Sequence, residues 1–315
     1  MSQEYSNEES APVNINSFHL AGIVPVSGQR LDYNLPWHDC LQPIAQNFLA
    51  VERAVLECAT AGCETIWVVC DSKMQPLIKH RAGEAVQDPV WISRKQDVYP
   101  STSRKEIPIY YVEVHPKDQK KRDSLAWSIL YGSRVAKRVS SGLSQWVEPN
   151  KFYVSFPYGI YPSQHLRKYR HEISSRGNFF VLTDLGESVL DGKFVGFAFE
   201  ADQLGSLIKY FWDIQTGKFD SSQPISERRD GKFITKVLPM EKRFSGRFFK
   251  VKDIFQKLDQ TKDTFKIEMK WFYEISTWED YCNYLSSDER KKMLCPKMKF
   301  LRSRRWNKVG KDDED

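Results

Sequence analysis

Residues 18–70 read FHLAGIVPVSGQRLDYNLPWHDCLQPIAQNFLAVERAVLECATAGCETIWVVC, and they contain the pattern of two strands with a helix between them. The apolar run Phe18–Val26 is continuous, which is typical of a strand buried on both faces. From Ile44 the apolar residues recur every three or four positions, which predicts a helix that ends at Gly62. The β-branched run Thr65–Cys70 predicts a second strand. This order indicates a βαβ unit with parallel strands and a right-handed crossover.

The rest of the chain continues to alternate between strands and helices. We expect strands at 107–114, 151–156, 179–183, 194–200 and 264–271, and helices at 123–139, 202–212 and 248–258. One continuous sheet explains this order best, so the predicted fold is α/β, with a mixed, mainly parallel sheet flanked by helices.

Composition divides the chain into three predicted parts. Residues 1–17 are polar and lack apolar periodicity, so we expect a flexible N-terminal arm. The α/β domain is predicted over 18–285, and 286–315 is predicted to be a basic C-terminal extension with an acidic end.

The overall composition excludes several classes of protein. The chain has 315 residues, of which 41% are hydrophobic and 13% aromatic, more than a disordered chain carries. No window approaches the roughly 18 uninterrupted apolar residues of a membrane-spanning helix. The polar start MSQEYSNEES lacks the features of a signal peptide. We therefore expect a cytoplasmic protein that does not enter a membrane.

Cysteine and histidine spacing gives no sign of a metal centre or a disulfide framework. The six cysteines include no C-x-x-C pair, and the six histidines have no metal-ligand or triad-like spacing.

The net charge of +6 is modest, but basic residues are concentrated between 290 and 311, where no acidic residue occurs. Arg302, Arg304, Arg305 and Trp306 are candidate contacts for nucleic acid or an acidic protein partner. A solubilising end without a partner is the equally supported alternative.

Four sets of residues, in order along the chain, carry a resemblance to a known family. The first is Val26-Ser27-Gly28-Gln29-Arg30-Leu31, followed by Leu35-Pro36, Pro43-Ile44 and Ala61-Gly62. The others are Asp123-Ser124-Leu125-Ala126, Tyr158-Gly159-Ile160-Tyr161-Pro162 and the segment 272–280. Together they resemble the sugar-nucleotide pyrophosphorylases, which are nucleotidyltransferases with a GT-A-like, nucleotide-diphospho-sugar transferase fold. Each motif alone is a weak signal.

The resemblance implies where a nucleotide would bind. Backbone N–H groups of the turn formed by Ser27, Gly28 and Gln29 would cradle phosphates, with Arg30 as the main cation. Asp123 and Ser124 would face the base and the sugar. From the residues alone, an ordinary strand-to-loop turn and a simple helix cap are the alternative interpretations.

The resemblance also implies a magnesium site, and here the sequence departs from the family. The strand-end Asp of the family reads Ile160, the second metal position keeps a carboxylate as Glu274, and the family's Lys after Leu-Pro reads Trp37. An isoleucine cannot coordinate a cation. Asp32, Asp39 and Asp71 are the alternative metal ligands.

Two functions remain open on the sequence. The first is binding of a nucleotide or nucleotide-sugar, with Mg²⁺-dependent transfer of a nucleotidyl group to a sugar phosphate if the site is active. The second is a catalytically inactive module that engages nucleic acid or a protein assembly through the basic C-terminal end.

Overall fold

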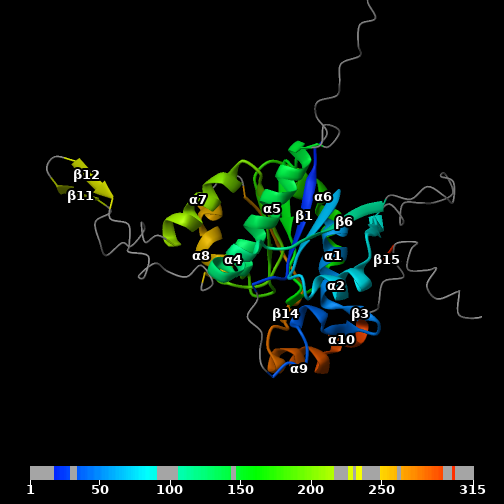
Figure 1. The fold of residues 1–315 in the computed structure, drawn as a ribbon. Helices are drawn as coiled ribbons and strands as arrows, with labels where there is room; N and C mark the ends of the chain where they lie inside the picture. Colours follow the sequence, from blue (N-terminus) through cyan, green and yellow to red (C-terminus); the bar gives the residue numbers. More distant parts are fainter. Residues whose placement is uncertain are drawn as a thin grey trace, which may run out of the picture.

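A nine-stranded sheet runs through the centre of the described part of the chain, in the order β13-β9-β10-β7-β1-β4-β6-β5-β15 (Figure 1). The structure is a computed structural model, and it describes residues 18–28, 34–90, 106–142, 147–215, 226–229, 232–235, 249–260, 264–293 and 300–301. The strands of the sheet are β1 (Leu20–Pro25), β4 (Thr65–Val69), β5 (Ala85–Gln87), β6 (Glu106–Val112), β7 (Lys151–Val154), β9 (Asn178–Leu182), β10 (Phe197–Glu200), β13 (Thr264–Glu268) and β15 (Phe300–Leu301).

The remaining elements are short hairpins and flanking helices. The strand pairs are β2 (Pro43–Ala45) with β3 (Phe48–Leu49), β8 (Gly159–Ile160) with β14 (Tyr273–Glu274), and β11 (Ser226–Arg229) with β12 (Lys232–Thr235). The α-helices are α1 (Ala50–Ala61), α2 (Gln75–Ala82), α4 (Pro116–Arg122), α5 (Leu125–Gly142), α6 (Arg170–Ser174), α7 (Gln203–Gln215), α8 (Val251–Phe255), α9 (Trp278–Ser286) and α10 (Asp288–Lys292). Single 3₁₀ segments are η1 (Asp39–Leu41), η2 (Ser163–Tyr169), η3 (Val189–Asp191) and η6 (Gln256–Gln260).

The sheet is mixed and mainly parallel, as the sequence predicts. β1 pairs in parallel with β4 and β7, β4 with β6, and β9 with β13. Only β10 and β5 run antiparallel to both of their neighbours in this sheet. The predicted βαβ unit is β1-α1-β4. Because the chain moves outward from β1 to β4 and later returns to β7 on the other side of β1, the strand order reverses at β1, the place where open α/β sheets bind ligands.

The two sides of the sheet carry different helices. A Cβ added to Gly22 of β1 would meet Cys58 of α1, whereas one added to Gly132 of α5 would meet Ile23 of β1. Successive strand residues point to opposite faces, so α1 and α5 cover opposite faces of the sheet. α2, α6 and η2 pack with α1, and α7 and α8 pack with α5.

One predicted helix begins later than its periodicity indicates. The apolar spacing predicts a helix from Ile44, but the residues before Ala50 form the β2-β3 hairpin. Asn47 in its turn has a φ of 55°, a left-handed conformation that cannot continue a helix. The predicted end is confirmed, since Gly62 has a φ of 100° and its N–H bonds to the carbonyl of Ala59.

The C-terminal part contributes to the sheet edge. β15 pairs antiparallel with β5, with Phe300 opposite Val86. The division at residue 286 stays a prediction, and residues 1–17 and 302–315 lie outside the described residues. Among the helices described, none combines the length and the apolar character needed to cross a membrane.

Candidate functional site

The turn after β1 lies directly on the first residues of α5, which brings two of the predicted motifs together. Gly28 has a φ of 86°, and a Cβ added there would lie 2.4 to 2.5 Å from backbone atoms of Ser124. Contacts that short do not occur, so only glycine allows this approach. The turn is held from the other side by the carbonyl of Val69, which accepts from the N–H groups of Val26 and Ser27 at 2.8 and 3.0 Å.

The hydroxyl of Ser27 joins the ends of β1 and β4 to the start of α5. It lies 2.9 Å from Oδ1 of Asp71 and 3.1 Å from Oδ1 of Asp123. Asp71 follows β4 by two residues, and the carboxyl ends of parallel strands meet at the same edge of a sheet. Because a hydroxyl has one proton, Ser27 cannot donate fully to both carboxylates. On the α5 side, Ser128 donates to the carbonyl of Ser27 at 2.6 Å.

Ser124 is the N-terminal cap of α5. Its hydroxyl accepts from the N–H of Trp127 at 3.3 Å, and its carbonyl accepts from the N–H of Ser128 at 2.9 Å. The capping interpretation is therefore confirmed. Asp123 precedes the first turn, where the helix dipole favours a negative group.

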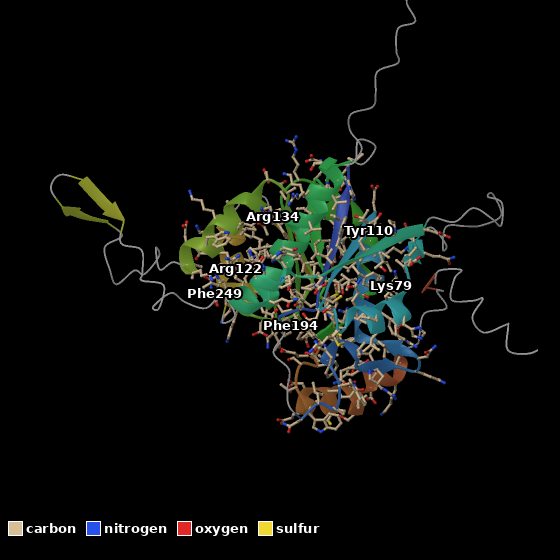
Figure 2. The ribbon with its side chains drawn as sticks, viewed as in Figure 1. Lys79, Tyr110, Arg122, Arg134, Phe194 and Phe249 are labelled. Carbon is tan, nitrogen blue, oxygen red and sulfur yellow. The ribbon has the colours of Figure 1, made fainter. Side chains whose placement is uncertain are left out.

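Tyr158 and Asp39 add a buried polar layer beside this turn. Tyr158 donates to the carbonyl of Val26 at 3.1 Å, and its ring packs edge-on at 5.3 Å between centroids against Phe194. Phe194 is labelled in Figure 2. Burial raises the pKa of the Tyr158 hydroxyl well above its ordinary value, and the nearby charges of Asp39 and Asp71 add to this shift. Tyr158 is therefore a neutral hydrogen-bond donor at any ordinary pH.

Asp39 carries a buried carboxylate with neither oxygen hydrogen-bonded. Nδ1 of His38 lies 2.9 Å from its Oδ1, but that nitrogen accepts from the N–H of Cys40. Trp37, which stands where the family has Lys, is 47% exposed and donates its indole N–H to Gln42 at 3.0 Å. In the segment 37–39, the buried side chain is therefore the acidic Asp39, and Trp37 at the family's Lys position is exposed.

The family's magnesium site does not fit the residues present. β7 ends at Val154, and Ile160 lies further on, in β8, where its buried side chain offers no ligand. Glu274 lies on the paired strand β14, as the resemblance implies, and its Oε1 accepts from Ser276 at 2.6 Å. Within the described ranges, no three or more His, Cys, Asp or Glu side chains are grouped to hold a metal.

Several predicted site residues lie outside the described residues: Gln29, Arg30, Asp32, Arg302, Arg304, Arg305 and Trp306. Sequence reasoning did not find the contributions of Ser128 and Tyr158. Tyr158 belongs to one of the motifs that carry the resemblance, but no pattern indicates these contacts, since each is made to the backbone of a residue more than 100 positions away.

Comparisons with known proteins establish the fold. No protein-family model and no curated protein matches the sequence. A structure described as a glucose-1-phosphate thymidylyltransferase from Bacillus anthracis, in complex with sucrose, is 11% identical and has a TM-score of 0.53, covering 88% of this chain and 98% of that one. The chain has the nucleotidyltransferase fold.

Two further solved structures are similar over the same part of the chain. A nucleotidyl transferase from Methanothermobacter thermautotroptrophicus is 13% identical, with a TM-score of 0.49 and coverage of 87% of this chain and 98% of that one. A UDP-glucose pyrophosphorylase complexed with UDP-glucose is 11% identical, with a TM-score of 0.47 and coverage of 87% and 100%. The similarity to the thymidylyltransferase structure confirms the fold that the sequence motifs predict.

Proposed function

We propose that this protein binds a nucleotide or nucleotide-sugar at the carboxyl ends of β1 and β4, against the first turn of α5. The observation that carries the proposal is the contact of Gly28 with the backbone of Ser124. This contact supports it because a glycine turn packed on a helix N-terminus presents backbone N–H groups to one point, which suits an anionic phosphate.

The charges around this turn suggest a division of roles within the bound ligand. Asp71 and Asp123 are acceptors only when ionised, so they suit ribose or sugar hydroxyls and base N–H groups rather than phosphates. The phosphates would lie toward the N–H of Gly28, because the N–H of Ser27 already donates to the carbonyl of Val69, with Arg30 as the cation that the sequence resemblance implies.

A second candidate function, a binding module without nucleotidyl transfer, is favoured by one specific observation. Ile160 is fully buried at the family's metal position, and Glu274, which lies opposite Gly159 on the paired strand β14, accepts a hydrogen bond from Ser276. Transfer by the family's mechanism requires a cation at this place, and one carboxylate beside an isoleucine is a poor magnesium site. We therefore derive no catalytic step through magnesium and propose binding that does not depend on it.

The test is thermal stabilisation by nucleoside triphosphates and nucleotide-sugars, each with Mg²⁺ and with a chelator. A ligand at 100 times its Kd adds about 2.7 kcal/mol to the free energy of unfolding. We expect one ligand class to stabilise the protein equally in both conditions, without release of pyrophosphate from a triphosphate and a sugar phosphate. Pyrophosphate release that requires Mg²⁺ would overturn the binding-module function, and no stabilisation by any ligand would overturn nucleotide binding.

Three variants place the ligand. Asp71→Ala and Arg30→Ala should each weaken binding by about 1.5–3 kcal/mol, the size of a hydrogen bond to a charged group. Glu84→Ala is the control, since Glu84 forms only an exposed ion pair with Lys79. If Asp71→Ala and Arg30→Ala bind the ligand as tightly as Glu84→Ala does, the ligand does not bind at the Gly28 turn.

A further inference from the structure

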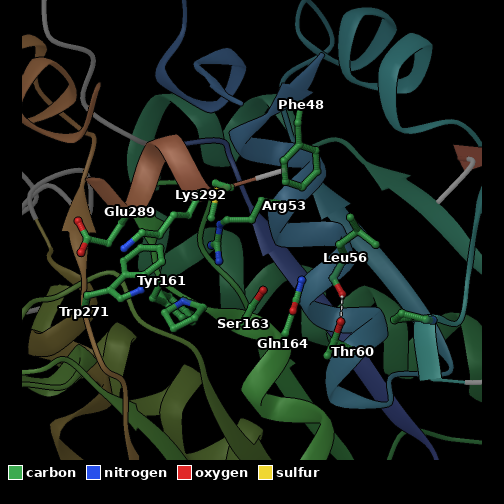
Figure 3. A pocket seen from close by; sticks show the side chains of 13 residues that line it. Phe48, Arg53, Leu56, Thr60, Tyr161, Ser163, Gln164, Trp271, Glu289 and Lys292 are labelled. Atoms are coloured by element: carbon green, nitrogen blue, oxygen red, sulfur yellow. Dashed lines mark hydrogen bonds between the residues drawn. The ribbon is translucent and has the colours of Figure 1, made fainter. Parts of the chain in front are cut away.

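A cavity of about 570 Å³ lies on the face of the sheet covered by α1, away from α5 (Figure 3). α1, the segment after β8, Trp271 and α10 enclose it, and its walls include Phe48, Arg53, Tyr161, Gln164 and Lys292. None of the residues that line the cavity belongs to the turn at Gly28 or to the start of α5. Its volume is within the range of small-molecule sites.

The floor of the cavity is a buried polar network with one donor left over. Arg53 donates through Nη1 to Glu57 at 2.7 Å and through Nη2 to the carbonyl of Phe156 at 2.6 Å. Tyr153 and Tyr161 both donate to the other oxygen of Glu57. Arg53 is 2% exposed, and its Nε has no hydrogen-bond partner. This nitrogen has almost no accessible surface, so the network fixes the Arg53 side chain in the floor without presenting this N–H to the cavity.

The walls combine flat apolar surfaces with groups that both donate and accept. Phe48, Tyr161 and Trp271 present aromatic rings, and Figure 3 shows Tyr161 and Trp271 next to each other on one side. Ser163 and Gln164, at the start of η2, also line the cavity (Figure 3). Hydroxyl and amide groups can donate and accept at once.

The charges that line the cavity balance. Glu57 neutralises Arg53 in the floor, and Glu289 and Lys292 carry one charge of each sign at the α10 side. An anionic phosphate would need an excess of positive charge here, because desolvating it without a partner is expensive. The charge balance favours a neutral ligand.

We propose that this cavity is a second ligand site that binds a neutral polyhydroxylated ring, a mono- or disaccharide. One C–H face of the ring would lie on Trp271, and its hydroxyls would bond to Gln164 and Ser163. The site is independent of the proposed nucleotide site, because it lies on the other face of the sheet and shares no residue with it.

The experiment is saturation-transfer NMR and calorimetric titration of the full chain with glucose, maltose and sucrose as probes. Uridine and glucose 1-phosphate are the comparison ligands. We expect saturable binding of at least one neutral saccharide that neither uridine nor glucose 1-phosphate displaces. No saturable binding of any saccharide, or displacement of the saccharide by uridine, would overturn the proposal.

Variants locate the bound saccharide. Trp271→Ala should raise its Kd by about tenfold or more, which corresponds to about 1.4 kcal/mol or more and is typical of truncating an aromatic anchor. Trp278→Ala is the matched control, because Trp278 is 42% exposed on α9 and does not line the cavity. Gln164→Ala, at an exposed position, gives a second variant that leaves the fold intact. Binding unchanged in both Trp271→Ala and Gln164→Ala would overturn the proposal, whatever the nucleotide experiments show.

Discussion

Replacing Gly28 by alanine tests the contact on which the candidate site rests. The added Cβ has two separate costs. A non-glycine residue at a φ of 86° loses about 1–2 kcal/mol from the left-handed conformation alone. The Cβ also meets the backbone of Ser124 at 2.4 to 2.5 Å, and relieving such overpacking costs about 1–3 kcal/mol more. The expected loss in the free energy of unfolding is therefore about 2–5 kcal/mol.

Gly186 provides the matched control for this experiment. Its φ is 75°, but a Cβ added there would meet nothing within 4 Å. Gly186→Ala should therefore show only the conformational cost, about 1–2 kcal/mol. Urea denaturation of both variants gives the difference, which isolates the steric contact with Ser124. A Gly28→Ala variant no less stable than Gly186→Ala, within about 0.5 kcal/mol, would refute the close approach of this turn to α5.

Three further predictions concern stability, pH and the basic end. Glu57→Ala leaves the Arg53 cation buried without its partner and should cost about 3–5 kcal/mol by urea denaturation. The exposed Glu84→Ala should change stability by less than about 1 kcal/mol, and equal losses would contradict the buried pair. Burial lowers the pKa of Lys151 to about 8, so the folded state binds fewer protons than the unfolded state above this pH. Stability should rise with pH between about 8 and 10 relative to Lys151→Met, and parallel pH profiles would exclude the shift. Deleting 302–315 should remove any salt-dependent nucleic-acid affinity, and an unchanged affinity in a gel-shift assay would contradict a role for this end.

The periodicity of apolar residues predicted the main helices and strands, because each of these elements buries one or both of its faces in the core. The strand from Phe18, the strand at Thr65–Cys70 and the helix end at Gly62 all follow from local pattern, and the structure confirms them. The β2-β3 hairpin was missed because Ile44 and Phe48 keep helical spacing, while the turn at Asn47 depends on a single left-handed residue. The spacing of apolar residues along the chain does not indicate a chain reversal of this kind.

The position of β10 shows what local pattern cannot supply. Phe194–Glu200 reads as an ordinary strand, yet β10 lies antiparallel between β7 and β9. Its direction depends on where the connections leave the sheet and not on its own residues. The order of strands is therefore known only from the whole chain.

For the site, sequence motifs predicted that the Ser27-Gly28 turn and the Asp123-Ser124 pair belong together, and the structure brings them into contact. The hydrogen bonds of Ser128 and Tyr158 could not be predicted, because they are made to backbone groups distant in sequence. Asp39 was expected only as an alternative metal ligand, and its burial depends on the packing of the whole fold. The Arg53 network was also missed, since Arg53 and Glu57 at this spacing are typical of an exposed helical pair.

The pairing of β15 with β5 means that one edge of the described sheet is closed by residues that are synthesised long after β5. While a nascent chain lacks Phe300 and Leu301, the outer side of β5 has no strand beside it. Unpaired strand edges are templates for contacts between chains. Translation products that stop before residue 300 should therefore aggregate more readily during expression than the full chain does, and light scattering of the two at equal concentration would show the difference.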